Sequence, residues 1–145
     1  MDRGFAVLIM VVVGGLIALQ APINAGLGRA TGNFAAAAIS FAIGTVLLAT
    51  IVALSGKTGG LGDVAHVEWY YLLGGALGAA YVFSALVLVS EIGAGPVAAA
   101  TVTGQLATSV VLDRIGFLGL DQEPITPARV LGVVLLLAGT YLVVR

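Results

Sequence analysis

The sequence predicts an all-α polytopic membrane protein of five transmembrane helices. Five long apolar stretches fill most of the 145 residues, and short polar segments separate them. Each stretch approaches the ~20 residues that a helix needs to cross a hydrocarbon core of ~30 Å. We expect a single membrane domain over residues 1–145, with helices at about residues 4–30, 33–54, 69–91, 96–113 and 126–144.

Composition excludes a water-exposed surface. The chain is 60% hydrophobic and 9% charged, with a mean hydropathy of +1.15, whereas a soluble domain carries roughly 25% charged residues. The net charge of −1 provides no basic surface for nucleic acid, and the chain has no cysteine for disulfides or sulfur metal sites. We therefore expect the lipid bilayer as the surroundings, with no nucleic-acid partner and no cofactor.

The first apolar stretch begins at Phe5 and extends toward Ala30. Met1-Asp2-Arg3 and the string Ile23-Asn24-Ala25 also fit a cleaved signal peptide loosely, but four further apolar spans follow, which favours a membrane helix. An odd number of spans places the two termini on opposite sides of the membrane. It also prevents a self-contained inverted repeat, so we expect the protein to work as a pair.

The connecting segments carry the signals that end and start helices. Residues 55–68 form a glycine-rich polar loop, and Trp69, Tyr70 and Tyr71 open the third span as an interfacial aromatic cluster. Gly95-Pro96 predicts a tight turn that starts the fourth helix, and Thr126 predicts the N-cap of the fifth.

Lysine and arginine counts predict the orientation. Four of these residues lie on the N-terminal side of the membrane and two on the other, namely Arg3, Lys57, Arg114 and Arg129 against Arg29 and Arg145. The positive-inside rule then predicts a cytoplasmic N-terminus and an external C-terminus. Because the margin is small, insertion in both orientations is compatible with the sequence.

Two amides and a proline mark the first span. Gln20 and Asn24 lie four residues apart, hence on one helix face, and Pro22 between them cannot donate to the carbonyl of Ala18. A broken backbone beside polar side chains is how many transporters build a binding site, so we expect both amides to line a path and Pro22 to act as a hinge. Interfacial capping and helix–helix hydrogen bonding remain alternatives.

The fourth span has a polar stripe, because Thr101, Gln105, Ser109 and Asp113 recur every four residues. Such a row should face protein or water, since polar groups facing lipid would stay unpaired. Bonds from the hydroxyls back to their own helix would explain threonine and serine without any function, but they explain Gln105 poorly.

Two acids at helix ends, Glu91 and Asp113, are candidates either for coupling transport to an ion or for a place at the membrane interface. Asp113 lies beside Arg114 and within reach of Arg129, which favours an interfacial salt bridge, while Glu91 has no neighbouring cation in the sequence. Asp63, His66 and Glu68 match no known metal-site spacing, so we expect a solvated loop and no metal site. No set of residues predicts catalysis, and we expect the protein not to be an enzyme.

Small residues predict the packing surfaces. Gly74 and Gly78 form a small-xxx-small face on the third span, which allows close contact between helix backbones.

Several strings together resemble the drug/metabolite transporter superfamily, and in particular its short, five-helix YdcZ-like branch of unknown function. They occur in order along the whole chain as Gln20-Ala-Pro-Ile-Asn24-Ala, Ser40-Phe-Ala-Ile-Gly44, Gly74-Gly-Ala-Leu-Gly78-Ala, Gly104-Gln105-Leu, Asp113-Arg-Ile-Gly116 and Arg129-Val-Leu-Gly132. The resemblance implies half of a ten-helix inverted-repeat EamA-like transporter fold. Such a half would pair antiparallel with itself or with a related half-size subunit.

The function predicted from these observations is transport of a small molecule across the prokaryotic inner membrane, by alternating access in an antiparallel dimer. Gln20, Asn24 and Gln105 would bind the substrate, and Thr101 and Ser109 would line its path. The first span lacks the acid that small multidrug antiporters carry there, which disfavours simple proton-for-drug exchange. A small dual-topology channel and a non-transporting structural subunit are the alternatives.

Overall fold

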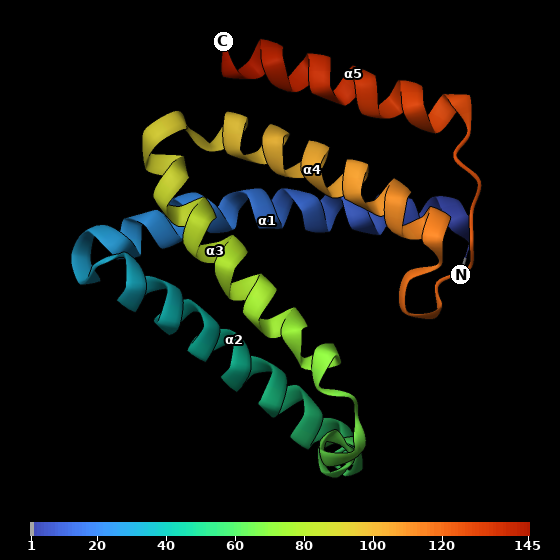
Figure 1. The fold of residues 1–145 in the computed structure, drawn as a ribbon. Coiled ribbons are helices and arrows are strands. Elements are labelled where there is room, and N and C mark those ends of the chain that lie inside the picture. Colours follow the sequence, from blue (N-terminus) through green and yellow to red (C-terminus); the bar gives the residue numbers. More distant parts are fainter. Residues whose placement is uncertain (1) are drawn as a thin grey trace. The chain divides into compact units, whose positions relative to one another are not determined.

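The computed structural model describes residues 2–145, and within them every regular element is a helix (Figure 1). Five helices are long and apolar enough to cross a membrane, which confirms the predicted fold class. They are α1 (Arg3–Thr31), α2 (Asn33–Ser55), α3 (Leu73–Ile92, entered through the 3-10 turn η2, Trp69–Leu72), α4 (Ala94–Ile115) and α5 (Pro127–Val144).

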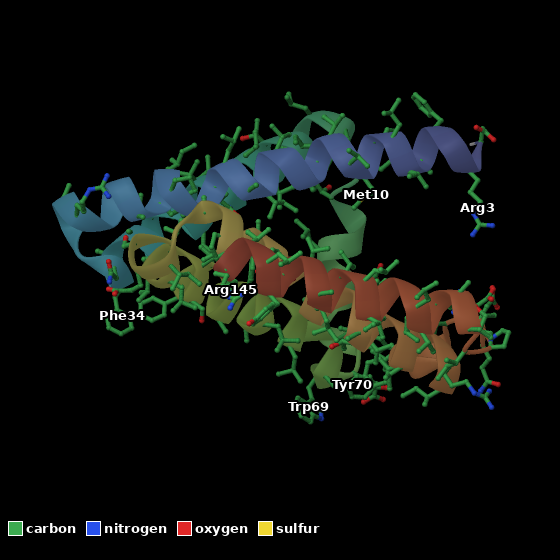
Figure 2. All side chains as sticks on the ribbon, turned by 90° about the horizontal axis from the view of Figure 1, so that it is seen from above. Arg3, Met10, Phe34, Trp69, Tyr70 and Arg145 are labelled. Carbon is green, nitrogen blue, oxygen red and sulfur yellow. The ribbon has the colours of Figure 1, made fainter. Side chains whose placement is uncertain are left out.

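Apolar side chains stand out from all five helices, as Met10 does on α1 (Figure 2). In water these surfaces would be strongly unfavourable, because each Å² of exposed apolar surface costs roughly 25 cal/mol. Lipid removes that cost, so the exposure is what a membrane-embedded chain requires.

Helix ends follow local capping chemistry. The Asp2 carboxylate accepts a hydrogen bond from the Phe5 backbone N–H at 3.3 Å and caps α1. Gly32, at φ +86°, separates α1 from α2 in a conformation that favours glycine. The Thr126 hydroxyl accepts from the Arg129 N–H at 3.3 Å, which confirms it as the N-cap of α5.

The turn before α4 differs from the one expected. Gly95 and Pro96 lie inside the first turn of α4, and the N-cap of the helix is Gly93, whose φ is +87°. The expected Gly95-Pro96 turn is therefore wrong. A proline is accommodated within the first helical turn because the N–H groups there have no partner in the helix.

The residues that the structure describes form two compact units, one ending at Ser90 and the other spanning Glu91–Arg145. A single membrane domain over the whole chain stays a prediction.

The first unit is built on the α1–α2 hairpin (Figure 1). Gly28 lets the two helices approach closely, since a Cβ there would lie 2.8 Å from the Asn33 side-chain oxygen. Helix α3 contacts α2 through aromatic rings: Phe83 stacks on Phe34 with centroids 4.6 Å apart.

The second unit is the α4–α5 hairpin. The Thr103 and Thr140 hydroxyls are 2.6 Å apart at the interface between the two helices, and the Thr140 hydroxyl also donates to the Ala99 carbonyl of α4 at 3.1 Å. Polar contacts of this kind hold helices together in lipid, where the hydrophobic effect does not.

Candidate functional site

Gln20 lines a groove between α1 and α2. The groove has a volume of about 210 Å³, and its other lining residues all come from one face of α2: Ser40, Phe41, Gly44, Thr45 and Leu48. The Gln20 side chain is exposed. The first span thus presents an amide to a groove that α2 lines with both polar and apolar side chains.

Asn24, one helical turn from Gln20, is buried with 5% of its surface exposed. Its side-chain nitrogen Nδ2 has no hydrogen-bond partner within residues 2–145. Of the alternatives for this residue, interfacial capping does not fit a buried amide. A buried amide without a partner costs about 1–3 kcal/mol, so the site favours a water or ligand that accepts its proton.

Pro22 lies within a continuous helix. Helix α1 runs from Arg3 to Thr31 with the proline inside it, so the broken backbone expected at this position is not observed. One missing hydrogen bond is tolerated because the neighbouring turns keep theirs. The hinge role of Pro22 stays a prediction.

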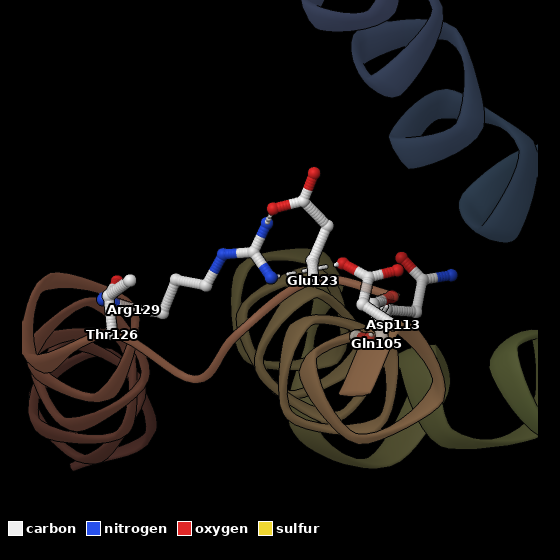
Figure 3. Close-up of polar contacts among 6 residues, drawn as sticks. Gln105, Asp113, Glu123, Thr126 and Arg129 are labelled. Carbon is white, nitrogen blue, oxygen red and sulfur yellow. Dashed lines mark hydrogen bonds and ion pairs between the residues drawn. The ribbon is translucent and has the colours of Figure 1, made fainter. Parts of the chain in front are cut away.

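The polar stripe on α4 faces away from α5. At ~100° per residue, Gln105 lies about 200° around the helix from Thr103, which contacts α5. Gln105 and Ser109 are exposed and Thr101 is half-buried, and the Gln105 amide points away from α5 (Figure 3). Within its own unit this face has no covering helix.

Within residues 2–145, the two hydroxyls of the stripe differ: Thr101 makes no side-chain hydrogen bond, and Ser109 behaves as expected for a helical serine. The Ser109 hydroxyl donates to the Gln105 backbone carbonyl at 2.7 Å, so its hydrogen-bonding need is met inside the helix. No such bond is available to the longer Gln105 side chain, which reaches beyond its own backbone. Gln105 is therefore the residue of the stripe that most requires a partner outside the helix.

Thr140 is a residue that sequence reasoning missed. It is one of few polar side chains on α5, and the structure places it opposite Thr103. The pairing of the one threonine within α5 with the hydroxyl-rich α4 could have indicated this contact. Its role is to hold the hairpin together.

Asp113 forms the expected interfacial ion pair. Its carboxylate lies 3.5 Å from the Arg129 guanidinium, which also contacts Glu123 at 3.5 Å (Figure 3). Because Asp113 is paired, it is less available for coupling than Glu91, which is exposed and makes no ion pair within residues 2–145.

The two glycines of α3 differ in their surroundings. A Cβ on Gly78 would lie 3.6 Å from the Phe41 ring of α2, whereas a Cβ on Gly74 would meet nothing within 4 Å. Gly78 thus supports packing inside the first unit. Gly74 leaves open space for a further contact.

Comparison with known proteins identifies the chain. The family described as "Putative inner membrane exporter, YdcZ" matches residues 5–142. The chain is also 30% identical to "Inner membrane protein YdcZ" of Escherichia coli (strain K12) over 104 residues, which cover 71% of this chain and 69% of that protein. No solved structure matches the chain. The five apolar helices and the match over nearly their full length agree, and the chain therefore belongs to the YdcZ family of inner-membrane transporters, of the drug/metabolite transporter type.

Proposed function

We propose that this transporter moves a small uncharged or amphiphilic molecule across the inner membrane by alternating access, as an antiparallel dimer of five-helix halves. The observation that carries the proposal is the uncovered Gln105 face of α4. The family description, which names an exporter, supports outward transport.

The argument from Gln105 is one of solvation. A primary amide facing lipid would lose its hydrogen bonds, at a cost of several kcal/mol per unpaired group. Since α5 covers the other side of α4, Gln105 needs water, substrate or another polypeptide beside it. A polar substrate path satisfies this need, and Thr101 and Ser109 would extend it along the same face.

The antiparallel dimer is supported by two features of the chain. An odd number of spans means that two copies can form an inverted repeat only by inserting in opposite orientations. The bias of four cations against two is weak, and Arg129 is already paired with two carboxylates. A weak bias permits both orientations.

Replacement of Gln105 by alanine tests the proposal. Cells expressing the wild type are first screened for efflux of a panel of neutral amphiphiles, and the molecule exported becomes the assay substrate. We expect Gln105→Ala to lower its transport about tenfold or more, because the amide's contact with substrate is lost. The matched control is Val111→Ala, at an exposed position about 120° around the same helix from Gln105. Normal transport by folded Gln105→Ala would overturn the assignment.

A channel is the second candidate, and the hydroxyls of Thr101 and Ser109 on the uncovered face favour it. A channel requires a continuous pore and conducts far faster than a transporter turns over. Single-channel currents would identify a channel, whereas saturable uptake identifies alternating access. Co-purification with a larger partner, with no transport after reconstitution, would instead identify a structural subunit.

A further inference from the structure

The groove between α1 and α2 is lined by both polar and apolar side chains. Gln20, Ser40 and Thr45 contribute polar groups, while Phe41 and Leu48 contribute an aromatic ring and an aliphatic side chain. The groove has free space beside Gly44, because an added Cβ there would meet nothing within 4 Å. This combination is typical of sites for small molecules, which hold an apolar body and orient it with a few polar groups.

The polar groups of the groove have hydrogen-bonding capacity that the protein does not use. Other hydroxyls in the same unit bond back to their own helix: Thr31 to the Leu27 carbonyl at 3.0 Å and Thr50 to the Val46 carbonyl at 2.8 Å. In the part of the chain that the structure describes, the Ser40 and Thr45 hydroxyls and the Gln20 amide make no such bond. These three groups can therefore bond to a ligand without breaking an existing contact.

Asn24, the other amide of α1, lies outside the lining of the groove. It follows Gln20 by one helical turn, it is buried, and its Nδ2 donor is unpaired within the described residues. This donor is enclosed by the protein, so it is no contact for a ligand in the groove. The hydroxyl or carbonyl oxygen of a ligand bonds instead to the Gln20 amide, which lines the groove.

Charge and size define the class of ligand. No residue that lines the groove is ionisable, so nothing there compensates the desolvation of a charged ligand. The volume of about 210 Å³ exceeds the roughly 150 Å³ that suffices for a benzene ring in an engineered cavity of another protein. A single ring with one polar substituent therefore fits.

We propose that the α1–α2 groove binds a small uncharged molecule that carries a hydroxyl or amide group on an apolar ring. The polar group bonds to the Gln20 amide and to one of the two hydroxyls, Ser40 or Thr45, and the ring lies against Phe41 and Leu48. This inference rests on the proposed function, because it names the class of molecule transported and one place where it binds.

Phe41 gives the groove a route to influence the rest of its unit. The same ring that lines the groove lies against Gly78 of α3, 3.6 Å from the position of an added Cβ. A ligand that displaces Phe41 would therefore change the contact between α2 and α3.

The experiment measures binding directly and needs no transport assay. The probe is 4-fluorobenzyl alcohol, titrated into the full-length protein in lipid nanodiscs and followed by fluorine NMR, with empty nanodiscs as the blank. We expect saturable binding above the blank. Two comparison probes, 4-fluorotoluene without a hydroxyl and the cation 4-fluorobenzylammonium, should each bind about tenfold more weakly.

Glycine variants test the location of the site. Gly44→Leu should fill the groove and lower probe affinity at least tenfold, and Gly44→Ala, which the backbone accommodates, should lower it by a smaller factor. Gly15→Leu is the matched control, because a Cβ at Gly15 also meets nothing within 4 Å and the residue lies outside the groove. Its affinity should equal that of the wild type.

The outcomes separate the two proposals. Three results would each overturn the groove as the binding site: probe binding no greater than to empty nanodiscs, equal binding of 4-fluorotoluene, or unchanged affinity in both Gly44 variants. A groove filled by a lipid chain would give the first of these results. Saturable, Gly44-dependent binding without any transport would keep the site and reject the transporter proposal. Gln105-dependent transport without probe binding would reject the site and keep the transporter proposal.

Discussion

Gln20 and Asn24 occupy the same side of α1 but have different surroundings. Gln20 is exposed and lines the groove, whereas Asn24 is buried with an unpaired nitrogen. Both amides would be costly in lipid, yet only the buried one lowers the stability of the fold itself. Residues of this kind persist when function requires them, since an apolar side chain would be the more stable choice.

The first prediction concerns Asn24→Leu, a change that replaces the buried amide with an apolar side chain of similar size. We expect the free energy of unfolding to rise by roughly 1–3 kcal/mol, because an unpaired buried donor is removed. Transport should fall at the same time, because Asn24 is one of the residues predicted to bind the substrate. Thermal unfolding of the purified protein and the efflux assay measure the two effects.

A loss of stability in Asn24→Leu would contradict this reasoning, since it would show that the amide has a partner in the protein. Leu19→Ala, at an exposed position on the same helix, is the control for a general effect of substitution on α1.

The second prediction concerns the hydroxyl pair of the α4–α5 hairpin. Thr103→Val keeps the shape of the side chain but removes its hydrogen bond to Thr140, whose hydroxyl still reaches the Ala99 carbonyl. We expect a loss of about 0.5–1.5 kcal/mol in unfolding free energy, the usual contribution of one hydrogen bond. Thr108→Val, exposed on the same helix, should change stability little. Denaturation in detergent compares the variants.

Individual elements are held at their ends by local chemistry and along their length by few contacts. The α4–α5 connection is an example, because Arg129 at the start of α5 joins Asp113 at the end of α4 and Glu123 in the loop. The Glu123 N–H also donates to the Asp113 carbonyl at 3.0 Å. These contacts order the loop outside the membrane and fix where α5 begins.

The third prediction concerns Arg129→Gln. All three side chains are partly exposed, so solvent screens the pairs and the expected loss of stability is less than about 1 kcal/mol. The loop itself should become more mobile, which faster hydrogen–deuterium exchange at residues 116–126 would show. Arg114→Gln is the control, because Arg114 is exposed and makes no ion pair in residues 2–145. Unchanged exchange in Arg129→Gln would mean that the backbone alone orders the loop.

At the scale of the whole molecule, the spans contain few buried residues. Helix α5 has none, α2 has one, α4 has two and α3 has three. A transporter needs more protein around its substrate path than this. A second subunit, as in the proposed dimer, would supply the missing surface.

The fourth prediction concerns orientation in the membrane. A cytoplasm-active fluorescent protein and a periplasm-active phosphatase are fused separately after Arg145. If the chain forms an antiparallel homodimer, both fusions should be active to a comparable extent. Phosphatase activity alone would place the C-terminus outside, and the inverted partner would then have to be another protein.

The fold could be predicted from the sequence to a large extent, because lipid imposes a simple rule. A backbone in a hydrocarbon core must satisfy its own hydrogen bonds, so each apolar run of sufficient length becomes a helix. The N-cap at Thr126 could be predicted from local chemistry in the same way. The predicted turn at Gly95-Pro96 was wrong because Gly93, two residues earlier, adopts the positive φ that ends the preceding helix.

The sequence by itself determined which residues are polar within the membrane, and only the tertiary structure decided what each of them faces. Helical spacing placed Gln105 and Thr103 on one span, but the contact with Thr140 shows which of them packs against α5. The α1–α2 groove likewise depends on residues twenty or more positions apart in the chain. The physical reason is that apolar helices in lipid are nearly equivalent partners for one another, so packing is selected by small residues and a few polar contacts between distant segments.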